Sequence, residues 1–202
     1  GQPVYNTGFN KQARALAMRV LEQFRDSEYV LVPSGSCAAT LRVFYLELFS
    51  DDPQLLEQAE ALAAKTYEFS EFLVNILNVE EASACGATHQ GSTVYHPSCH
   101  LLRELGVKTQ PRKLLQSVPG LEEKELEGAE VCCGFGGTFS VKFPHISEGM
   151  VADKIANIQA SGADTLVACD MSCLMNMGGA LNRQGSDINV RHLAQILDAE
   201  SQ

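Results

Sequence analysis

The chain has 202 residues, of which 45% are hydrophobic and 20% are charged, and its formal net charge is -10. These values are typical of a globular protein with one domain, or with two small halves that share a core. The acidic balance argues against a nucleic-acid partner, because binding to phosphates requires a basic surface. No apolar run reaches the roughly 18–20 residues of a membrane-spanning helix, so we expect no membrane span.

In the first part of the chain, apolar residues at helical spacing predict helices, and one short aliphatic run predicts a buried strand. Asp52 followed by Pro53 is typical of a helix start, with Asp as the cap and Pro at the first helical position. The predicted elements are, in chain order, a helix over 11–24, a strand over 29–33, a helix over 38–49 and a helix over 53–77.

After a polar connection over 80–92, short strands alternate with helices. Gly106 and Gly162 follow two of the helical segments, as glycine commonly does at a helix end. The predicted strands are 93–96, 130–133, 165–168 and 187–190, and the predicted helices are 101–105, 146–160, 174–182 and 191–199.

The alternation of strands and helices predicts an α/β fold with mainly parallel sheets and flanking helices. The sequence also contains an internal repeat, since the segments 1–37 and 134–173 each have a glycine, a long helix, an aliphatic strand and a turn that ends in Ser-Cys. We therefore expect two tandem cysteine-rich halves in a pseudo-symmetric arrangement, residues 1–78 and residues 79–202.

The two copies of the repeat differ at their start. Cys132 and Cys133 precede Gly134, and an equivalent pair in the first copy would precede Gly1. We therefore expect the natural protein to begin upstream of this sequence, so that its first repeat is truncated here.

Five of the seven cysteines fall into three groups: Cys99, the pair Cys132 and Cys133, and Cys169 with Cys173. In the predicted fold each group follows a strand and precedes a helix, at the edge where open parallel sheets bind ligands. Thiolates gathered at one place favour a soft metal, in an iron–sulfur cluster, a zinc site or a Cu(I) site. Together with the lack of a secretory signal pattern, this use of cysteine predicts a reducing, cytoplasmic location.

Zinc and plain core packing are the alternatives to an iron–sulfur cluster. Four thiolates complete a tetrahedral zinc site and leave a fifth cysteine superfluous, and zinc ligands are seldom adjacent as Cys132 and Cys133 are. Free cysteines are often buried without any function, but their recurrence at three turns argues against that interpretation.

Two histidines, His96 and His100, flank Cys99. A histidine beside a cysteine is able to activate the thiolate as a nucleophile. We expect these two instead to donate hydrogen bonds or to face solvent, the commoner roles of histidine.

Several stretches carry a resemblance to a known family. They are Tyr95–Arg103 (YHPSCHLLR), Cys132–Ser140 (CCGFGGTFS), Asp170–Met175 (DMSCLM) and Gln2–Asn6 (QPVYN). They resemble the lactate utilization protein A family of cysteine-rich CCG-domain iron–sulfur proteins, which is related to the CCG-domain subunit of heterodisulfide reductase and to the iron–sulfur subunit of glycolate oxidase. The resemblance covers essentially the whole chain.

The resemblance implies a ligand set. Carried over residue by residue, it implies a cluster of the 4Fe–4S type, with zinc as the substitute metal, held by Cys99, Cys132, Cys133, Cys169 and Cys173. Cys37 would be the remnant ligand of the first repeat, in which Pro33 stands where the second repeat has Cys169.

The resemblance also implies a function, that of an electron-transfer subunit in a cytoplasmic system that oxidises L-lactate to pyruvate. The chain would be an oxidoreductase subunit rather than a complete enzyme, without catalytic residues of its own, and its partners would be other iron–sulfur or flavin subunits. The sequence has no dinucleotide-binding glycine pattern, so hydride chemistry would belong to a partner. Two alternatives stay open: a subunit of a thiol–disulfide reductase of the heterodisulfide type, and a zinc-stabilised, non-catalytic interaction module.

Overall fold

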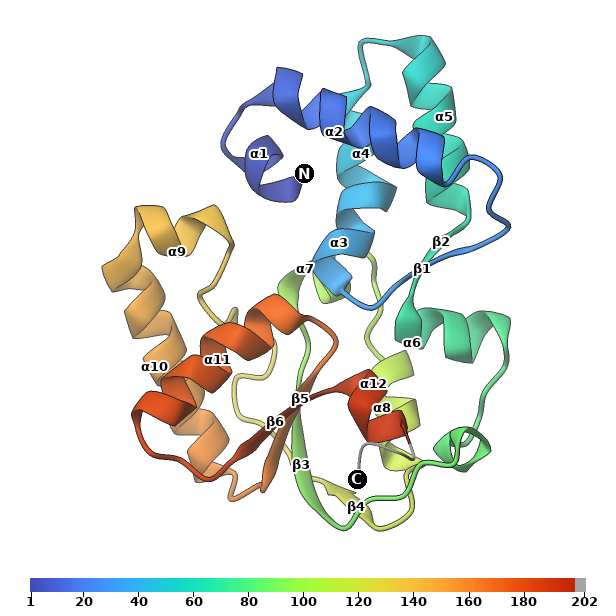
Figure 1. Cartoon of the computed structure of the whole chain (residues 1–202). Helices are drawn as coiled ribbons and strands as arrows, with labels where there is room; N and C mark the ends of the chain where they lie inside the picture. Colours follow the sequence, from blue (N-terminus) through green and yellow to red (C-terminus); the bar gives the residue numbers. More distant parts are fainter. Residues whose placement is uncertain (199–202) are drawn as a thin grey trace.

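The computed structural model describes residues 1–198, without the side chains of Ser83 and Cys85. Helices surround parallel sheets, so the predicted α/β class is confirmed (Figure 1). None of the helices in the described part combines the length and the apolar character that crossing a bilayer requires.

The first part of the chain forms a helical unit around a two-stranded sheet (Figure 1, blue to cyan). Its longer helices begin where the sequence predicts, and the Asp52 carboxylate caps one of them by accepting a hydrogen bond from Leu55 N at 3.2 Å. The elements are α1 (Gln2–Asn6), α2 (Asn10–Gln23), β1 (Val30–Val32), α3 (Gly35–Ala39), a π-helical turn (Thr40–Phe44), α4 (Tyr45–Leu48), α5 (Pro53–Ala64) and β2 (Thr66–Glu68).

The rest of the chain forms a four-stranded parallel sheet with helices on both faces (Figure 1, green to red). The elements are α6 (Phe69–Glu71), a π-helical turn (Phe72–Ile76), a 3-10 turn (Ala82–Cys85), β3 (Gly91–His96), α7 (Cys99–Arg103), α8 (Gln110–Gln116), β4 (Leu121–Glu123), α9 (Thr138–Lys142), α10 (Pro144–Ala160), β5 (Thr165–Ala168), α11 (Met171–Arg183), β6 (Asn189–His192) and α12 (Leu193–Leu197).

The larger sheet has the strand order β4-β3-β5-β6. The central strand β5 pairs with β3 from Thr93 opposite Thr165 to His96 opposite Ala168. All four residues of β5 are buried, as expected for a strand covered on both faces.

Alternate residues of β3 and β5 belong to two different core clusters. Val94, Leu166 and Ala168 pack with α10 and α11, whereas Tyr95 and Val167 pack with α8 and α12 on the other face. This period of two follows from the pleat of a strand, which points successive side chains to opposite faces. A third cluster, formed by α2, α4 and α5, is the core of the first part of the chain.

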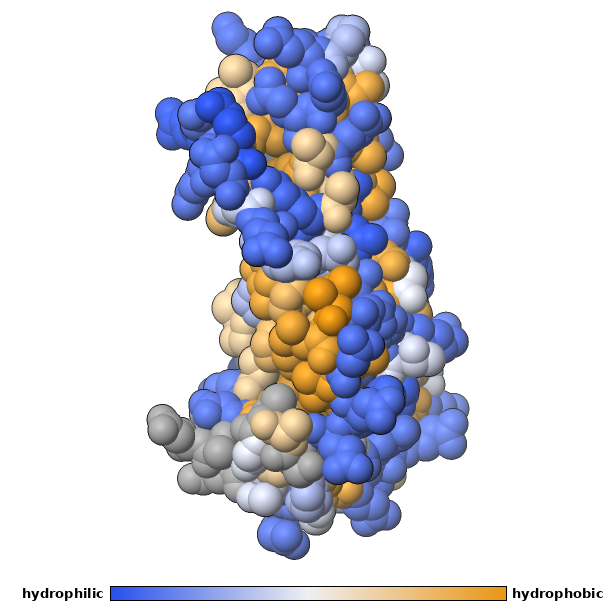
Figure 2. Space-filling model, turned by 90° about the vertical axis from the view of Figure 1, so that its right-hand side faces the viewer, coloured by the Kyte–Doolittle hydropathy of each residue, from blue (hydrophilic) through white to orange (hydrophobic). Residues whose placement is uncertain are grey.

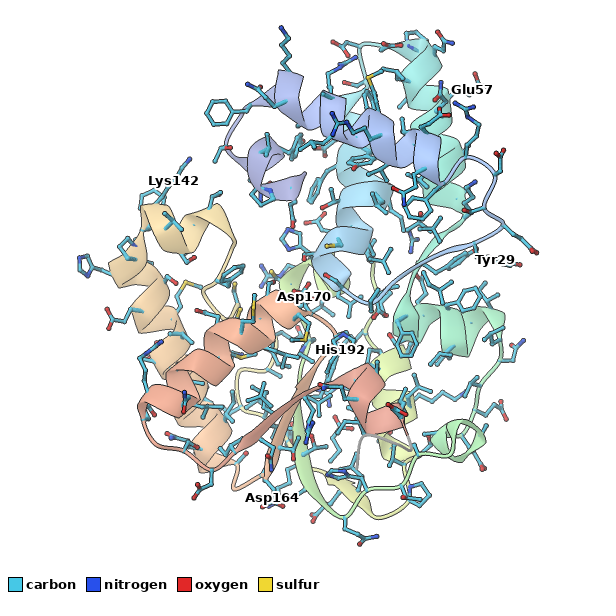
Figure 3. The ribbon with its side chains drawn as sticks, viewed as in Figure 1. Tyr29, Glu57, Lys142, Asp164, Asp170 and His192 are labelled. Carbon is cyan, nitrogen blue, oxygen red and sulfur yellow. The ribbon has the colours of Figure 1, made fainter. Side chains whose placement is uncertain are left out.

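The carboxyl ends of β1 and β5 meet in the middle of the molecule. Gly35 N donates to the Cys169 carbonyl at 3.2 Å, and Ser36 N donates to the Asp170 carboxylate at 2.8 Å. The same carboxylate is the N-cap of α11, where it accepts from Ser172 N at 3.1 Å. Figure 3 shows Asp170 between α3 and α11. One buried carboxylate therefore joins the helix starts of the two sheets.

Helix α3 also packs closely on α7. A Cβ atom at Gly35 would lie 2.6 Å from Leu101 Cβ and 2.7 Å from Ser98 Oγ, so a larger residue would push the two helices apart.

The face of the molecule in Figure 2 has an apolar surface around α6. Leu31 and Leu77 are half-exposed apolar residues of the chain.

The single helix predicted over 53–77 is wrong in its second half. The helix ends at Ala64, and Thr66–Glu68 form β2, which pairs in parallel with β1. Glu68 then caps the next turn by accepting from Ser70 N at 2.8 Å. Apolar residues continue at helical spacing past Ala64, so the sequence pattern does not show where the helix ends. Pairing with β1 holds residues 66–68 as a strand despite this spacing.

The strand predicted over 130–133 is also wrong, since these residues form an irregular loop. The fourth strand of the sheet is instead β4, and neither β4 nor α8 was predicted from the sequence. At the chain end, the predicted helix over 191–199 begins later, at Leu193, and Ala199 lies outside the described residues.

We predict that Asp170→Asn lowers the free energy of unfolding by about 2 kcal/mol, since it weakens hydrogen bonds from a charged acceptor to both α3 and α11. The control Asp153→Asn, at an exposed site on α10, should change it by less than about 0.5 kcal/mol. Urea denaturation at neutral pH measures both values.

Acidification provides a second check on Asp170. Burial opposes its charge, but hydrogen bonds from Ser172 and Ser36 outweigh burial and lower the pKa of Asp170 below 3.8. The stabilisation is therefore present above the unfolded value and disappears as the pH falls through the lower, folded pKa. The stability difference between wild type and Asp170→Asn should shrink in that acid range, and equal stability at neutral pH would contradict the bridging role.

Candidate metal centre

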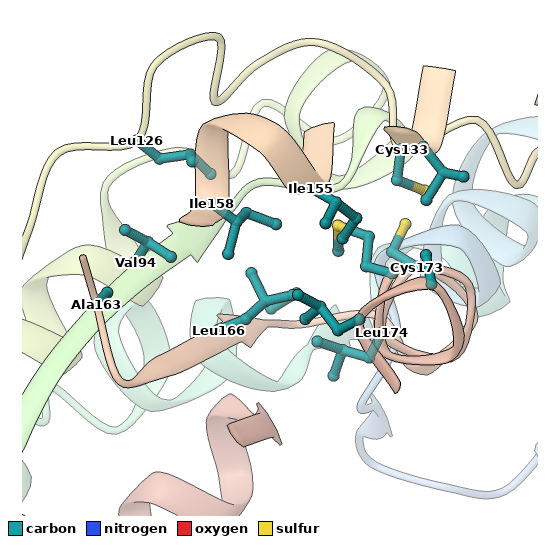
Figure 4. Packing of buried hydrophobic residues seen from close by; sticks show 14 residues of the cluster. Val94, Leu126, Cys133, Ile155, Ile158, Ala163, Leu166, Cys173 and Leu174 are labelled. Carbon is teal, nitrogen blue, oxygen red and sulfur yellow. The ribbon is translucent and has the colours of Figure 1, made fainter. Parts of the chain in front are cut away.

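Four cysteine side chains meet beside the carboxyl end of the sheet. Cys99 is the first residue of α7, directly after β3, and Cys173 lies in the first turn of α11, after β5. Cys132 and Cys133 come from the loop between β4 and α9. Figure 4 shows Cys133 and Cys173 together at one end of the core cluster, and Figure 3 shows sulfur atoms gathered near the start of α11.

The four thiols form a hydrogen-bonded chain that links Cys99 to Cys132, Cys132 to Cys133 and Cys133 to Cys173. The thiols of Cys133 and Cys99 donate to the Cys132 sulfur and lower the pKa of Cys132 well below its usual range. The same bonds raise the pKa values of Cys99 and Cys133, and burial raises both further. These hydrogen bonds favour the thiolate form of Cys132 over that of Cys99 or Cys133.

The loop that carries the cysteine pair is fixed by main-chain contacts. Gly134 N donates to Cys132 Sγ at 3.4 Å, and the side-chain amide of Asn176 on α11 donates to the Cys133 carbonyl at 2.9 Å. Gly134 has a φ of 85°, and a Cβ atom there would lie 2.8 Å from the Ser147 carbonyl oxygen. Only glycine fits this turn without displacing α10.

A buried lysine supports the same loop from α10. Lys154 is 2% exposed, and its Nζ donates to the carbonyls of Gly128 at 2.5 Å and Ala129 at 3.1 Å. Burial lowers the pKa of Lys154, while attraction from Cys133 and Cys132 acts in the opposite direction. The ammonium group thus positions the loop and places a positive charge near the thiols.

Cys169 does not join the other four cysteines. It continues the alternation of β5, so its side chain packs with Tyr95 and Val167 on the opposite face from Cys133 and Cys173. Its sulfur accepts a hydrogen bond from the Tyr95 hydroxyl at 3.6 Å, and burial raises the pKa of the Cys169 thiol. The expectation that five thiolates meet at one place is therefore replaced by a group of four.

Cys37, the predicted remnant ligand of the first repeat, is exposed on α3. Burial raises the pKa of Tyr45 on α4, and Cys37 raises it further. The structure places Cys37 in the first part of the chain, outside the group of four thiols.

The environment of His96 differs from the one predicted from the sequence. It is 1% exposed, so it does not face solvent, and it lies opposite Ala168 on the sheet face that carries the cysteines. Burial and repulsion from Lys154 lower the pKa of His96 to about 4, which keeps the ring neutral. The period of two along β3 could have placed His96 on this face.

His100 is half-buried on α7 and lies at the junction with the first part of the chain. Its Nδ1 lies 3.7 Å from Cys99 Sγ, its Nε2 lies 3.4 Å from Gln2 Nε2, and its ring packs edge-on against Phe44. These contacts agree with the predicted hydrogen-bonding role.

The donor set fits a soft metal. Sulfur ligands suit an iron–sulfur cluster or zinc, and a buried site in which main-chain N–H groups approach the sulfurs suits a cluster in particular. The ligand atoms of His96, Cys133 and Cys173 all lie within 4.8 Å of one another, the spacing of a potential metal site. The structure thus has the residues that a soft metal or a cluster requires.

Comparison with known proteins finds a cysteine-rich domain of the CCG type over residues 1–42 and 93–178. The chain is 49% identical to lactate utilization protein A of Shouchella clausii, over 99% of this chain and 82% of that protein. It is 47% identical to lactate utilization protein A of Bacillus subtilis, over 98% of this chain and 82% of that protein. The corresponding protein of Lysinibacillus sphaericus is 48% identical over 98% of this chain and 85% of its own length.

We predict that Cys133→Ser and Cys173→Ser each weaken the binding of Co²⁺ or iron. The loss of affinity should exceed the roughly 10–100-fold that follows when a residue that only hydrogen-bonds to a metal ligand is replaced. Cys169→Ser, a matched change at an equally buried position, should keep wild-type metal content because its sulfur lies on the other face of the sheet. Metal per chain after anaerobic loading measures this, with circular dichroism as the folding control. Equal losses in Cys169→Ser and Cys133→Ser would show that the group of four is incomplete.

Proposed function

Since the chain belongs to the lactate utilization protein A family and carries its cysteine-rich domain, we propose that it is an iron–sulfur electron-transfer subunit. It would serve a cytoplasmic system that oxidises L-lactate to pyruvate, as part of an oxidoreductase rather than as a complete enzyme. The names of the relatives support the link to lactate.

The observation that supports the proposal is that four thiols, from the starts of α7 and α11 and from the loop before α9, meet at one end of the core. Free cysteines so arranged, rather than paired in disulfides, suit a reducing compartment and a soft metal. When bound, an iron–sulfur cluster, which we propose to be of the 4Fe–4S type, would accept and release single electrons. Cys99, Cys132, Cys133 and Cys173 would hold it, and Cys169 would support the opposite face of the sheet.

The surroundings of the four thiols are suited to such a group. Lys154 provides a buried positive charge, which favours the thiolate form that metal binding requires. Gly134 N already donates to one sulfur, and such bonds tune the reduction potential of a cluster. Core residues on α10 and α11 cover the inner side of the thiols and limit access of water.

We also propose that the chain consists of two related halves, residues 1–78 and 79–202. The order α2-β1-α3 in the first half is matched by α10-β5-α11 in the second, and β2-α6 is matched by β6-α12. In these two series Glu68 and His192 occupy the same place, each as the N-cap of a short helix with a capping box. The halves interlock, because Phe69 and Leu73 pack into the core of the second half.

The proposed partners are other iron–sulfur or flavin subunits of the lactate-oxidising system. The segments that carry or follow the cysteines have exposed apolar side chains, which offer a surface for such contacts: Val131, Val141, Phe143, Ile146, Met171 and Met175. Val131 precedes the cysteine pair, the next three lie on α9, on α10 or between them, and the two methionines flank Cys173 on α11.

We predict that protein prepared without oxygen contains iron and acid-labile sulfide in similar amounts, with a broad visible absorption that bleaches on reduction. Elemental analysis for iron and zinc, a sulfide assay and a spectrum during reductive titration test this directly.

Zinc is the competing occupant, because a group of four thiols satisfies a tetrahedral zinc ion. Stoichiometric zinc without sulfide after attempted reconstitution would replace the electron-transfer proposal with a zinc-stabilised interaction module. Reoxidation of the reduced cluster by small disulfides, but not by one-electron acceptors, would instead favour the thiol–disulfide reductase.

A further inference from the structure

The side chain of His96 is polar, although it lies on an apolar face of the sheet. The residues beside it on the same sheet face, Val94, Leu166 and Ala168, are apolar and belong to the core. Both ring nitrogens of His96 are buried, and neither has a hydrogen-bond partner among the residues that the structure describes. The Ala129 carbonyl approaches the ring without reaching hydrogen-bond geometry.

A buried polar group without a partner is costly, commonly by a few kcal/mol, and calls for an explanation. Packing alone does not explain it, since valine or leucine would fill such a position without the penalty. Lys154, the nearest cation on α10, donates to the Gly128 and Ala129 carbonyls rather than to the ring.

The position of the ring supplies the explanation. A ring nitrogen of His96 and the Sγ atoms of Cys133 and Cys173 lie within 4.8 Å of one another. Ligand atoms on one metal ion, with bonds of about 2.0–2.3 Å, lie roughly 3.5–4 Å apart. A contraction of about 1 Å would therefore bring these three atoms to bonding distance from one metal ion.

The Ala129 carbonyl is a candidate acceptor for the proton on the other ring nitrogen of His96. A metal-bound histidine commonly donates its other N–H to a carbonyl, which fixes the tautomer and orients the ring. Ala129 is held by Lys154 beside the ring, so a proton shared with this carbonyl would leave the second nitrogen with a free lone pair.

We infer that His96 is a nitrogen ligand of the metal centre, beside Cys133 and Cys173. The inference rests on the proposed iron–sulfur function and gives that centre a mixed sulfur and nitrogen ligand set. Because neutral imidazole donates less charge than thiolate, this ligand raises the reduction potential relative to an all-cysteine site.

The test uses the full chain, reconstituted with iron and sulfide without oxygen and labelled with ¹⁵N-histidine. Pulsed electron paramagnetic resonance of the reduced protein should reveal the strong hyperfine coupling of a directly bound histidine nitrogen, and the coupling should change with the isotope. This readout works on wild-type protein and does not depend on the folding of a variant.

Three variants assign the signal. The coupling should persist in His145→Ala, an exposed histidine on α10, and disappear in His96→Ala. His96→Cys should keep iron and sulfide, lose the coupling and shift the reduction potential to a more negative value, which a merely structural histidine would not cause.

The outcomes separate the inference from the proposed function. Iron and sulfide at wild-type level with no coupling, or with only the weak coupling of a hydrogen-bonded histidine, would overturn the ligand role of His96 alone. Absence of iron and sulfide from the wild-type protein would overturn the proposed function, and the inference with it.

Discussion

The structure depends on the way two parallel sheets meet at their carboxyl ends. Asp170, buried at this junction, accepts hydrogen bonds from the start of α3 and caps α11, so one carboxylate fixes both helices. A parallel sheet directs its loops to one edge, and here the edges of two sheets face each other. The junction thereby brings α3, α7 and α11 together and sets the position of Cys99 and Cys173 at the helix starts.

The second constraint is the pleat of the strands, which decides which sulfurs are able to share a metal. Cys169 continues β5 and points to the face of Tyr95, whereas Cys173, one helical turn later, reaches the face of Cys133. His96 reaches the same face from β3. A thiolate group supported by Lys154 and by main-chain N–H groups is suited to hold a charged cluster inside an acidic protein.

The sequence predicted the α/β class, the principal helices and the strand over 165–168. It could not predict β2, because an apolar stripe continues from α5 through a strand that only pairing with β1 defines. The sequence grouped Cys169 with the other cysteines because it does not show that the alternation of β5 continues past Ala168. The sequence predicted a hydrogen-bonding or solvent-facing His96. The burial of this side chain could not be predicted, because it depends on packing of α10 and α11, which lie far along the chain.

We propose that four cysteines from three segments of the chain hold one iron–sulfur centre on a single face of the sheet. The most direct measurement is anomalous X-ray scattering at the iron edge, from crystals of anaerobically reconstituted protein. We expect anomalous density within bonding distance of Cys133 and Cys173 Sγ, near Cys99, Cys132 and the His96 ring, and remote from Cys169. Density bonded to Cys169 or Cys37, or zinc alone at the four thiols, would show that these four cysteines do not hold an iron–sulfur centre.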